Sequence, residues 1–396
     1  MTFRCRPVPT MLSGACLLMA GCSASERHAE IEAAPPVLTD GWRVAAPAEA
    51  GFEPGALAAL TADLDAGAYP NTHAVLIEHD GRLVFEEYFE GDDEFWGEPV
   101  GHVAFDRDSR HDLRSISKSV TAAVLGIALG DGFEAALDRP VLSFFSDNPR
   151  IRPSPGAEAV TLRHALTMTA GLEWNEMTVP YTDPDNDELQ LYAASDPVAL
   201  VLSRPVREPA GQRWYYSGGL TQVIAGVIEE VTGRPLGSYA DEVLFRPLGI
   251  TDYEWLEWGE WDRPAPRAAS GVRLRARDLA KFGSLFLHGG RWGERQIVPA
   301  SWVEESSRRH VPEAGEWSGD GVYGYALHWW HGRFGVPDAR FEAVTGRGNG
   351  GQRVFVIPTH DLVITVFAGN YNTATDGGER IAERVVAAHD PTRGAR

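Results

Sequence analysis

The sequence predicts an α/β (α+β) fold: an antiparallel sheet flanked by helices, built from strands near both termini, with an inserted region that is mainly helical. Two observations carry this prediction. Apolar runs interrupted by turn-forming residues lie within residues 74–85 and again within residues 354–367. Between them, from about residue 115 to about residue 260, the chain contains helices that end at glycines. Strands at both ends of a chain with helices between them indicate one sheet that contains both ends.

The first strand pair is predicted between residues 74 and 85. Ala74–Ile77 and Leu83–Phe85 are short apolar runs of strand length. Asp80-Gly81 lies between them, and this dipeptide is typical of the type I′ turn, in which both central residues have a positive φ angle. The segment is therefore predicted to be a tight antiparallel hairpin.

Two long helices are predicted inside the inserted region. One covers Ser115–Leu129 and ends at Gly130-Asp131-Gly132, and the other covers Leu220–Val231 and ends at Thr232-Gly233. Glycine commonly follows the last turn of a helix because it adopts the left-handed conformation without strain. The two glycine stops therefore mark the ends of both helices.

A second hairpin and a last helix are predicted near the C-terminus. Val354–Ile357 and Leu362–Phe367 flank the turn residues Pro358–Asp361. Gly378–Ala388 follows, with its larger apolar residues on one side of a helix. This hairpin is predicted to share the sheet with the N-terminal hairpin.

Residues 1–21 are predicted to be an export signal. Two arginines precede a short apolar stretch, Met11–Ala20, which is too short to span a membrane but suits the core of a signal peptide. The stretch ends in small residues directly before Cys22, and this resembles the lipobox of bacterial lipoproteins. The resemblance implies a lipid on Cys22 that anchors the protein to a membrane on the periplasmic side, with the outer membrane favoured by Ser23. The alternative is an ordinary signal peptide followed by an incidental cysteine.

The rest of the chain is predicted to form a tether and one domain. Residues 22–50 are polar and alanine-rich, and are predicted to be a flexible tether between lipid and domain. Residues 51–390 are predicted to form the folded domain. All three cysteines lie within the first 22 residues, so no disulfide is expected in the domain. The formal net charge of −20 argues against nucleic acid as a partner, because phosphate binding requires a basic surface.

A serine and a lysine with helical spacing open the first predicted helix. Ser115 and Lys118 occupy positions i and i+3, which share one helix face, so the hydroxyl and the amine can meet. The chain has only two lysines, Lys118 and Lys281, and its other permanently charged basic residues are arginines. Arginine does not deprotonate, whereas a buried neutral lysine can help to remove a serine proton. Ser115 is therefore predicted to be a nucleophile; the alternative is a surface lysine after a helix cap.

A tyrosine-rich segment, Pro209–Gly219, precedes the second predicted helix. Together with the Ser-x-x-Lys sequence, it resembles the β-lactamase-related serine hydrolases: class C β-lactamases, penicillin-binding proteins, esterases of the same fold and amide hydrolases of short oligomers. The resemblance implies that Tyr216 is a general base beside Lys118, with its phenol pKa lowered by a neighbouring cation. Tyr215 is the alternative for this role. Where the family often has Asn, this chain has Gly218, so an amide contact to the lysine or the substrate would be missing.

The glycine-rich segment Thr345–Gln352 precedes the second hairpin's first strand. In the family that the chain resembles, this strand edge supplies a backbone N–H that forms the oxyanion hole with the N–H of the nucleophilic serine. Glycines suit this place because the backbone must approach the substrate closely. The alternative is a flexible hairpin turn; a phosphate-binding loop is excluded because the segment leads into a strand and lacks the P-loop lysine. The matching candidates are Arg347, Gly348, Asn349 and Gly350, with Gly348 and Asn349 at the turn.

Tryptophans are the candidates for the wall of a substrate pocket. Trp174, together with Trp214 and the pair Trp329-Trp330, is expected either to line an acyl- or ring-binding pocket or to belong to the core. Arg347 is the candidate to replace the lysine of the family's K-T-G sequence.

The resemblance implies an enzyme that cleaves an ester or amide bond by two-step acyl transfer through Ser115, without a cofactor. The absence of H-E-x-x-H and of a Cys/His sequence cluster argues against a metal site. The expected partner is a small ester, amide or peptide. Two alternatives stay open: a D-amino-acid peptidase, carboxypeptidase or weak β-lactamase, and a non-catalytic lipid-anchored muropeptide-binding protein. The natural substrate and the oligomeric state are left open.

Overall fold

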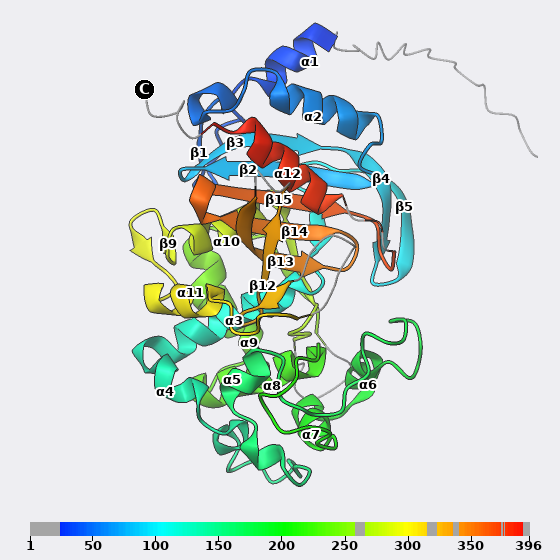
Figure 1. Ribbon diagram of the computed structural model, residues 1–396, viewed down its shortest axis with the longest axis vertical. Helices are drawn as coiled ribbons and strands as arrows, with labels where there is room; N and C mark the ends of the chain where they lie inside the picture. Colours follow the sequence, from blue (N-terminus) through cyan, green and yellow to red (C-terminus); the bar gives the residue numbers. More distant parts are fainter. Residues whose placement is uncertain are drawn as a thin grey trace, which may run out of the picture.

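A mixed sheet runs through the upper half of the molecule in the computed structural model (Figure 1). The structure describes residues 24–257, 266–314, 323–335, 340–373, 375 and 377–390. The strands of the sheet are β1 (Arg43–Val44), β2 (Thr72–His79), β3 (Arg82–Tyr88), β11 (Gly324–Tyr325), β12 (Trp330–Phe334), β13 (Phe341–Gly348), β14 (Gln352–Ile357) and β15 (Leu362–Ala368). Their order is β1-β3-β2-β15-β14-β13-β12-β11. The antiparallel pairing of β2 with β15 joins the two ends of the chain, as predicted.

Both predicted hairpins are confirmed. β2 and β3 pair in antiparallel fashion, and the turn between them has positive φ angles at Asp80 (50°) and Gly81 (68°), as a type I′ turn requires. β14 and β15 pair across the short helical turn Pro358–His360. Turn geometry and the apolar pattern together specify the pairing, although the register of β2 with β3 shifts between Ile77 and Glu78.

Helices cover both faces of the sheet. α2 (Ala56–Asp65) packs against α12 (Gly378–Ala388) in front of the sheet in Figure 1. α10 (Ala276–Leu287) packs against β2, β14 and β15 from behind. The observed α12 has the predicted bounds.

The inserted region is built around two helices that pack against each other, α3 (Ile116–Leu129) and α8 (Gly218–Thr232), close to the predicted bounds. By composition alone, residues 116–137 are apolar enough to cross a membrane. The first eleven residues of α3 are buried inside the fold, which accounts for their apolar character. The other helices are α1 (Ala24–Ile31), α4 (Phe133–Leu137), α5 (Leu162–Leu166), α6 (Asp187–Ala193), α7 (Pro197–Leu202), α9 (Leu236–Ala240) and α11 (Ala300–Ser307).

A small sheet closes the inserted region. β6 (Arg110–Asp112) comes just before α3 and pairs with β8 (Val272–Arg275), which also pairs with β7 (Glu254–Trp255). The chain therefore enters and leaves the insert at one place, directly beside Ser115. The remaining strands form two hairpins: β4 (Glu90–Phe95) with β5 (Glu98–Ala104), and β9 (Arg291–Trp292) with β10 (Arg295–Gln296).

The prediction of a flexible tether over residues 22–50 is wrong for the described part of that segment. α1 is a helix, and β1 pairs in parallel with β3 at the edge of the main sheet. Ile31 and Trp42 are 7% and 4% exposed. A composition that is polar and alanine-rich overall does not indicate that a few apolar residues are buried. These few residues are enough to order the segment because they pack on the surface of the domain. The predicted signal peptide and Cys22 lie outside the described residues.

Candidate active site

The predicted nucleophile and its lysine meet at the start of α3. Ser115 is the N-cap residue of the helix, and Nζ of Lys118 lies 3.1 Å from its Oγ. Lys118 is 1% exposed and also donates to the backbone carbonyl of Ala269, at 3.1 Å. The other lysine, Lys281, forms an ion pair with Asp278 inside α10. Only Lys118 is therefore placed to assist a serine nucleophile.

The backbone directly before Ser115 adopts an unusual conformation. Arg114 has a φ angle of 49°, in the left-handed region that residues with side chains rarely occupy. Its guanidinium donates to Glu94 at 3.0 Å and lies over the rings of Trp96 and Tyr371, 4.5 Å and 4.7 Å from their centroids. These contacts stabilise a conformation that costs about 1–3 kcal/mol. The strained turn presents Ser115 at the end of the helix.

Tyr216 joins this pair from the segment before α8. Its hydroxyl hydrogen-bonds with that of Ser115, and Lys118 Nζ lies 4.8 Å from the centroid of its ring. Burial raises the pKa of Tyr216 well above its usual value, and the charge of Glu176 raises this pKa further. Tyr216 is therefore a neutral phenol at neutral pH, and the expectation of a cation-lowered pKa is wrong. The alternative, Tyr215, lines a different cavity.

A buried carboxylate that no sequence motif indicated lies behind the tyrosine. Glu176 is 1% exposed, and its Oε2 accepts hydrogen bonds from Trp174 Nε1 (2.8 Å) and from the backbone N–H of Gly218 (2.6 Å). Its Oε1 accepts from the Tyr181 hydroxyl at 3.1 Å. Burial raises the pKa of Glu176 to about 7, although the nearby charge of Lys118 lowers it. The site therefore contains an acid that titrates near neutral pH.

The glycine-rich segment forms the end of β13 and the turn into β14. A Cβ atom on Gly348 would lie only 2.3 Å from the carbonyl oxygen of Leu113, two residues before Ser115. Gly350, in the turn, has a φ angle of 99°. The side chain of Asn349 hydrogen-bonds to the loop after β15. Glycine is therefore required where the sheet edge approaches the serine segment.

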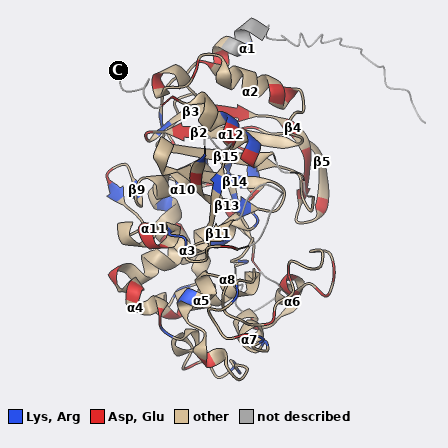
Figure 2. Cartoon of the chain, viewed as in Figure 1, with Lys and Arg blue, Asp and Glu red and all other residues tan. Residues whose placement is uncertain are grey.

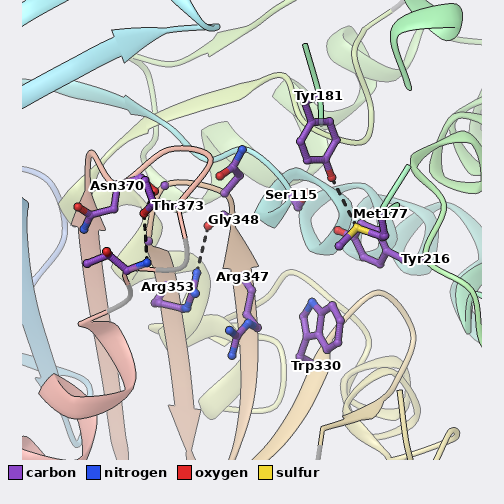
Figure 3. A pocket seen from close by; sticks show the side chains of 14 residues that line it. Ser115, Met177, Tyr181, Tyr216, Trp330, Arg347, Gly348, Arg353, Asn370 and Thr373 are labelled. Atoms are coloured by element: carbon purple, nitrogen blue, oxygen red, sulfur yellow. Dashed lines mark hydrogen bonds between the residues drawn. The ribbon is translucent and has the colours of Figure 1, made fainter. Parts of the chain in front are cut away.

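Ser115 opens into a cavity of about 390 Å³, with Tyr216 on one side and the Gly348 end of β13 on the other (Figure 3). Two lining residues, Met177 and Tyr181, belong to the loop before α6, which carries no recognisable motif. The full lining consists of Ser115, Met177, Tyr181, Tyr216, Trp330, Arg347, Gly348, Asn349, Gly350, Gly351, Arg353, Asn370, Thr373 and Thr375.

Two other predicted binding residues do not line this cavity. Trp174 and Gly218 both lie behind it, where they donate hydrogen bonds to Glu176. Among the other candidate tryptophans, Trp330 lines the cavity, whereas Trp329 is fully buried in the core. Sequence position does not reveal which of two adjacent tryptophans faces the cavity, because neighbouring residues on an extended segment point in opposite directions.

The sheet side of the cavity carries positive charge. Arg347 and Arg353 both form ion pairs with Glu379. Burial alone would raise the pKa of Glu379, but the two guanidinium groups lower it to about 2. Both guanidinium groups line the sheet side of the cavity, and guanidinium is a group that binds carboxylates. In Figure 2, basic residues lie on the ribbon around β13 and β14, whereas acidic residues recur on outer elements such as α2 and α4.

Comparisons with known proteins agree with this arrangement. The profile of the Beta-lactamase family matches residues 58–389. The chain is 26% identical over 345 residues to the 6-aminohexanoate-dimer hydrolase of Paenarthrobacter ureafaciens, which covers 81% of this chain and 78% of that protein. It is 30% identical over 154 residues to Esterase EstB of Burkholderia gladioli, covering 37% and 38% of the two chains. A penicillin-binding protein homologue from Caulobacter crescentus has the same fold, with a TM-score of 0.63, 18% identity and coverage of 85% of this chain and 97% of that one.

Proposed function

The chain belongs to the beta-lactamase family and is a serine hydrolase, and from this premise we propose that it cleaves an ester or amide bond of a small substrate through an acyl-Ser115 intermediate. One observation carries the proposal. The hydroxyl of Ser115 contacts both Lys118 and Tyr216 at the bottom of a cavity. This is the arrangement that nucleophilic catalysis by serine requires.

In the proposed first step, Oγ of Ser115 attacks the substrate carbonyl carbon, and its proton passes to the Lys118–Tyr216 pair. The backbone N–H groups of Ser115 and Asn349 stabilise the oxyanion. The bond to the leaving group then breaks, and the pair returns the proton to the leaving oxygen or nitrogen. In the second step, water attacks the acyl-serine and gives a proton to the pair, which passes it to Oγ of Ser115 as the acyl–oxygen bond breaks. The products are the carboxylic acid and free Ser115.

The cavity supports an ester or amide substrate with an acyl group of modest size. Met177 and Trp330 provide apolar surface, and Arg347 contributes to the positive wall. Two relatives, a 6-aminohexanoate-dimer hydrolase and an esterase, are named for this chemistry. The positive wall also suits the terminal carboxylate of a peptide, so a D-amino-acid peptidase is the second candidate.

We also propose that the protein is exported and held by a lipid on Cys22 at the periplasmic side of the outer membrane. α1 begins at Ala24, and its Arg27 forms an ion pair with Asp65 of α2. If Cys22 carries the lipid, the domain lies close to the bilayer with α1 and α2 nearest to it.

Labelling with a fluorophosphonate tests the proposed nucleophile. The purified protein should gain one adduct, and peptide mass spectrometry should locate it on Ser115. Ser115→Ala should give no adduct, and Lys118→Ala should be labelled at least about a hundredfold more slowly. A well-folded protein without an adduct would favour the non-catalytic muropeptide-binding alternative.

A substrate panel then separates the candidate activities. Short-chain p-nitrophenyl esters, the linear 6-aminohexanoate dimer, a D-Ala-D-Ala peptide and a chromogenic β-lactam should be compared by kcat/KM. We expect the ester or the amide dimer to be the best substrate. Faster release of D-Ala than of any ester product would make the peptidase the correct assignment.

A further inference from the structure

Two histidines and a carboxylate gather in the interior outside the residues that line the Ser115 cavity. His73 lies on β2, Asp93 on β4 and His111 on β6. One potential ligand atom from each residue lies within 4.8 Å of the others. Nδ1 of His73 is 2.9 Å from Nε2 of His111, which is 3.7 Å from Oδ1 of Asp93. The two histidines are 0% and 1% exposed.

The outer nitrogen of each ring contacts a group that can only accept a hydrogen bond. Asn71 donates through its Nδ2 to the carbonyl of Asp92 (2.9 Å) and accepts through its Oδ1 from the N–H of Asp92 (2.8 Å), so its orientation is determined. Nε2 of His73 lies 3.2 Å from that Oδ1 and therefore carries a hydrogen. Nδ1 of His111 lies 3.3 Å from the backbone carbonyl of Asp112 and carries one for the same reason.

When both rings are neutral, these contacts leave both inner nitrogens without a hydrogen. Nδ1 of His73 and Nε2 of His111 then direct lone pairs at each other across 2.9 Å, with a carboxylate oxygen of Asp93 beside them. Three electron-rich atoms in one buried place repel one another unless a positive centre lies between them. Metal-binding histidines commonly use the outer N–H in this way, donating it to a carbonyl or amide oxygen.

Two of the three spacings, those of His111 with His73 and with Asp93, suit a small transition-metal ion. Zinc binds histidine nitrogen and carboxylate oxygen at about 2.0–2.2 Å, which places ligand atoms of a tetrahedral site about 3.3 Å apart. The distances of 2.9 Å and 3.7 Å lie on either side of that value. Imidazole ligands favour zinc and similar metals over magnesium or calcium. Because the three residues come from three different strands, no short sequence motif indicates that they lie together.

We propose that His73, Asp93 and His111 bind one divalent transition-metal ion of the Zn²⁺ type, and that this ion has a structural role. The ion ties β2 to the β4–β5 hairpin and to the segment that leads into Ser115, which lies four residues after His111. Phe105 stacks on the His73 ring at 4.0 Å and Phe367 on the His111 ring at 4.8 Å. The covered rings lie outside the cavity lining, so the ion would not reach the substrate as a catalytic metal must, and the three residues fill three of the four positions of a tetrahedral ion.

Metal binding by the chelator-stripped protein tests the proposal. Zn²⁺ in equilibrium dialysis should bind at one ion per chain, and Co²⁺ should give the visible absorption of a tetrahedral site. Saturating Zn²⁺ should raise the Tm by about 3–6 °C. His73→Gln, His111→Gln and Asp93→Asn should each weaken Zn²⁺ binding at least about tenfold.

A matched control separates this site from chelation at the surface. His102 on β5 is an exposed histidine that contacts Asp92 at 3.1 Å, so His102→Gln should bind Zn²⁺ like the unmodified protein. Loss of binding in His102→Gln, with binding retained in His73→Gln, would overturn the proposal. So would an unmodified protein that binds no Zn²⁺ and shows no change in Tm. Circular dichroism in the presence of chelator shows whether each variant is folded. If a variant does not fold, the Co²⁺ spectrum of the unmodified protein still tests the site.

Discussion

The backbone N–H of Gly218 donates a 2.6 Å hydrogen bond to Oε2 of Glu176. A Cβ atom on Gly218 would lie 3.2 Å from the same oxygen, so a side chain here would crowd the carboxylate. The family that the chain resembles often has an asparagine at this position. Here the glycine makes room for an acid with a pKa of about 7, near Lys118 and Tyr216.

Replacing this acid should change the pH dependence of the reaction. The charge of Glu176 raises the pKa of Tyr216, so Glu176→Gln should lower that pKa and favour the phenolate. We expect kcat/KM of the unmodified protein to change around pH 7, where Glu176 titrates, and this change to be absent in Glu176→Gln. Glu173→Gln, which changes an exposed residue paired with Arg207, should leave the profile in place. An identical profile for Glu176→Gln would remove Glu176 from the proton chemistry.

The same substitution should change how stability depends on pH. An unfolded glutamate loses its proton near 4.5, whereas folded Glu176 retains it up to about 7. Between these values the folded state binds more protons, so the free energy of unfolding falls as the pH rises, by about 3 kcal/mol in total. In Glu176→Gln the free energy of unfolding does not fall for this reason, because glutamine does not titrate. Its Tm relative to the unmodified protein should therefore increase from pH 4.5 to pH 8, and scanning calorimetry would measure it. A constant difference would contradict the raised pKa.

The two adjacent tyrosines allow a matched test of the part that Tyr216 plays in proton transfer. Tyr216→Phe removes the hydroxyl that contacts Ser115 and should lower kcat about 10²–10⁴-fold. Tyr215→Phe changes a residue of the other cavity and should alter kcat less than about threefold. Steady-state kinetics on the best ester substrate measures both. The reverse order of effects would assign the role to Tyr215.

The close approach of β13 to the serine segment predicts the effect of one added methyl group. In Gly348→Ala the new Cβ meets the carbonyl of Leu113, so the strand end must shift away from Ser115. We expect kcat/KM to fall at least about tenfold and stability to fall by about 1–3 kcal/mol. Gly132→Ala is the control, because nothing lies within 4 Å of its Cβ. Equal activity of the two variants would show that the oxyanion geometry does not depend on this approach.

Lipid labelling tests the proposed anchor. In cells that process lipoproteins, the unmodified protein should incorporate labelled palmitate and sediment with membranes. Cys22→Ala should lose both properties, because the lipid requires the thiol of the new N-terminal residue. Cys16→Ala, within the predicted signal-peptide core, should keep them. Labelling that persists in Cys22→Ala would exclude this cysteine as the attachment site.

The sequence by itself determined the features that depend on neighbouring residues. Asp80-Gly81 specifies a hairpin turn, glycine stops end α3 and α8, and the i, i+3 spacing brings Lys118 to Ser115 on one helix turn. These signals are local because turn chemistry and helix geometry act over a few residues. For the same reason the two hairpins and the contact between Ser115 and Lys118 were predictable.

Only the tertiary structure decided which residues distant in the sequence come together. Glu176 meets Gly218 across 42 positions, and His73 meets His111 across 38. The raised pKa of Tyr216 also comes from burial, which exists only once α3, α8 and the sheet have packed together. Such contacts have no local signal, because the free energy of burial depends on what the whole chain places around a group.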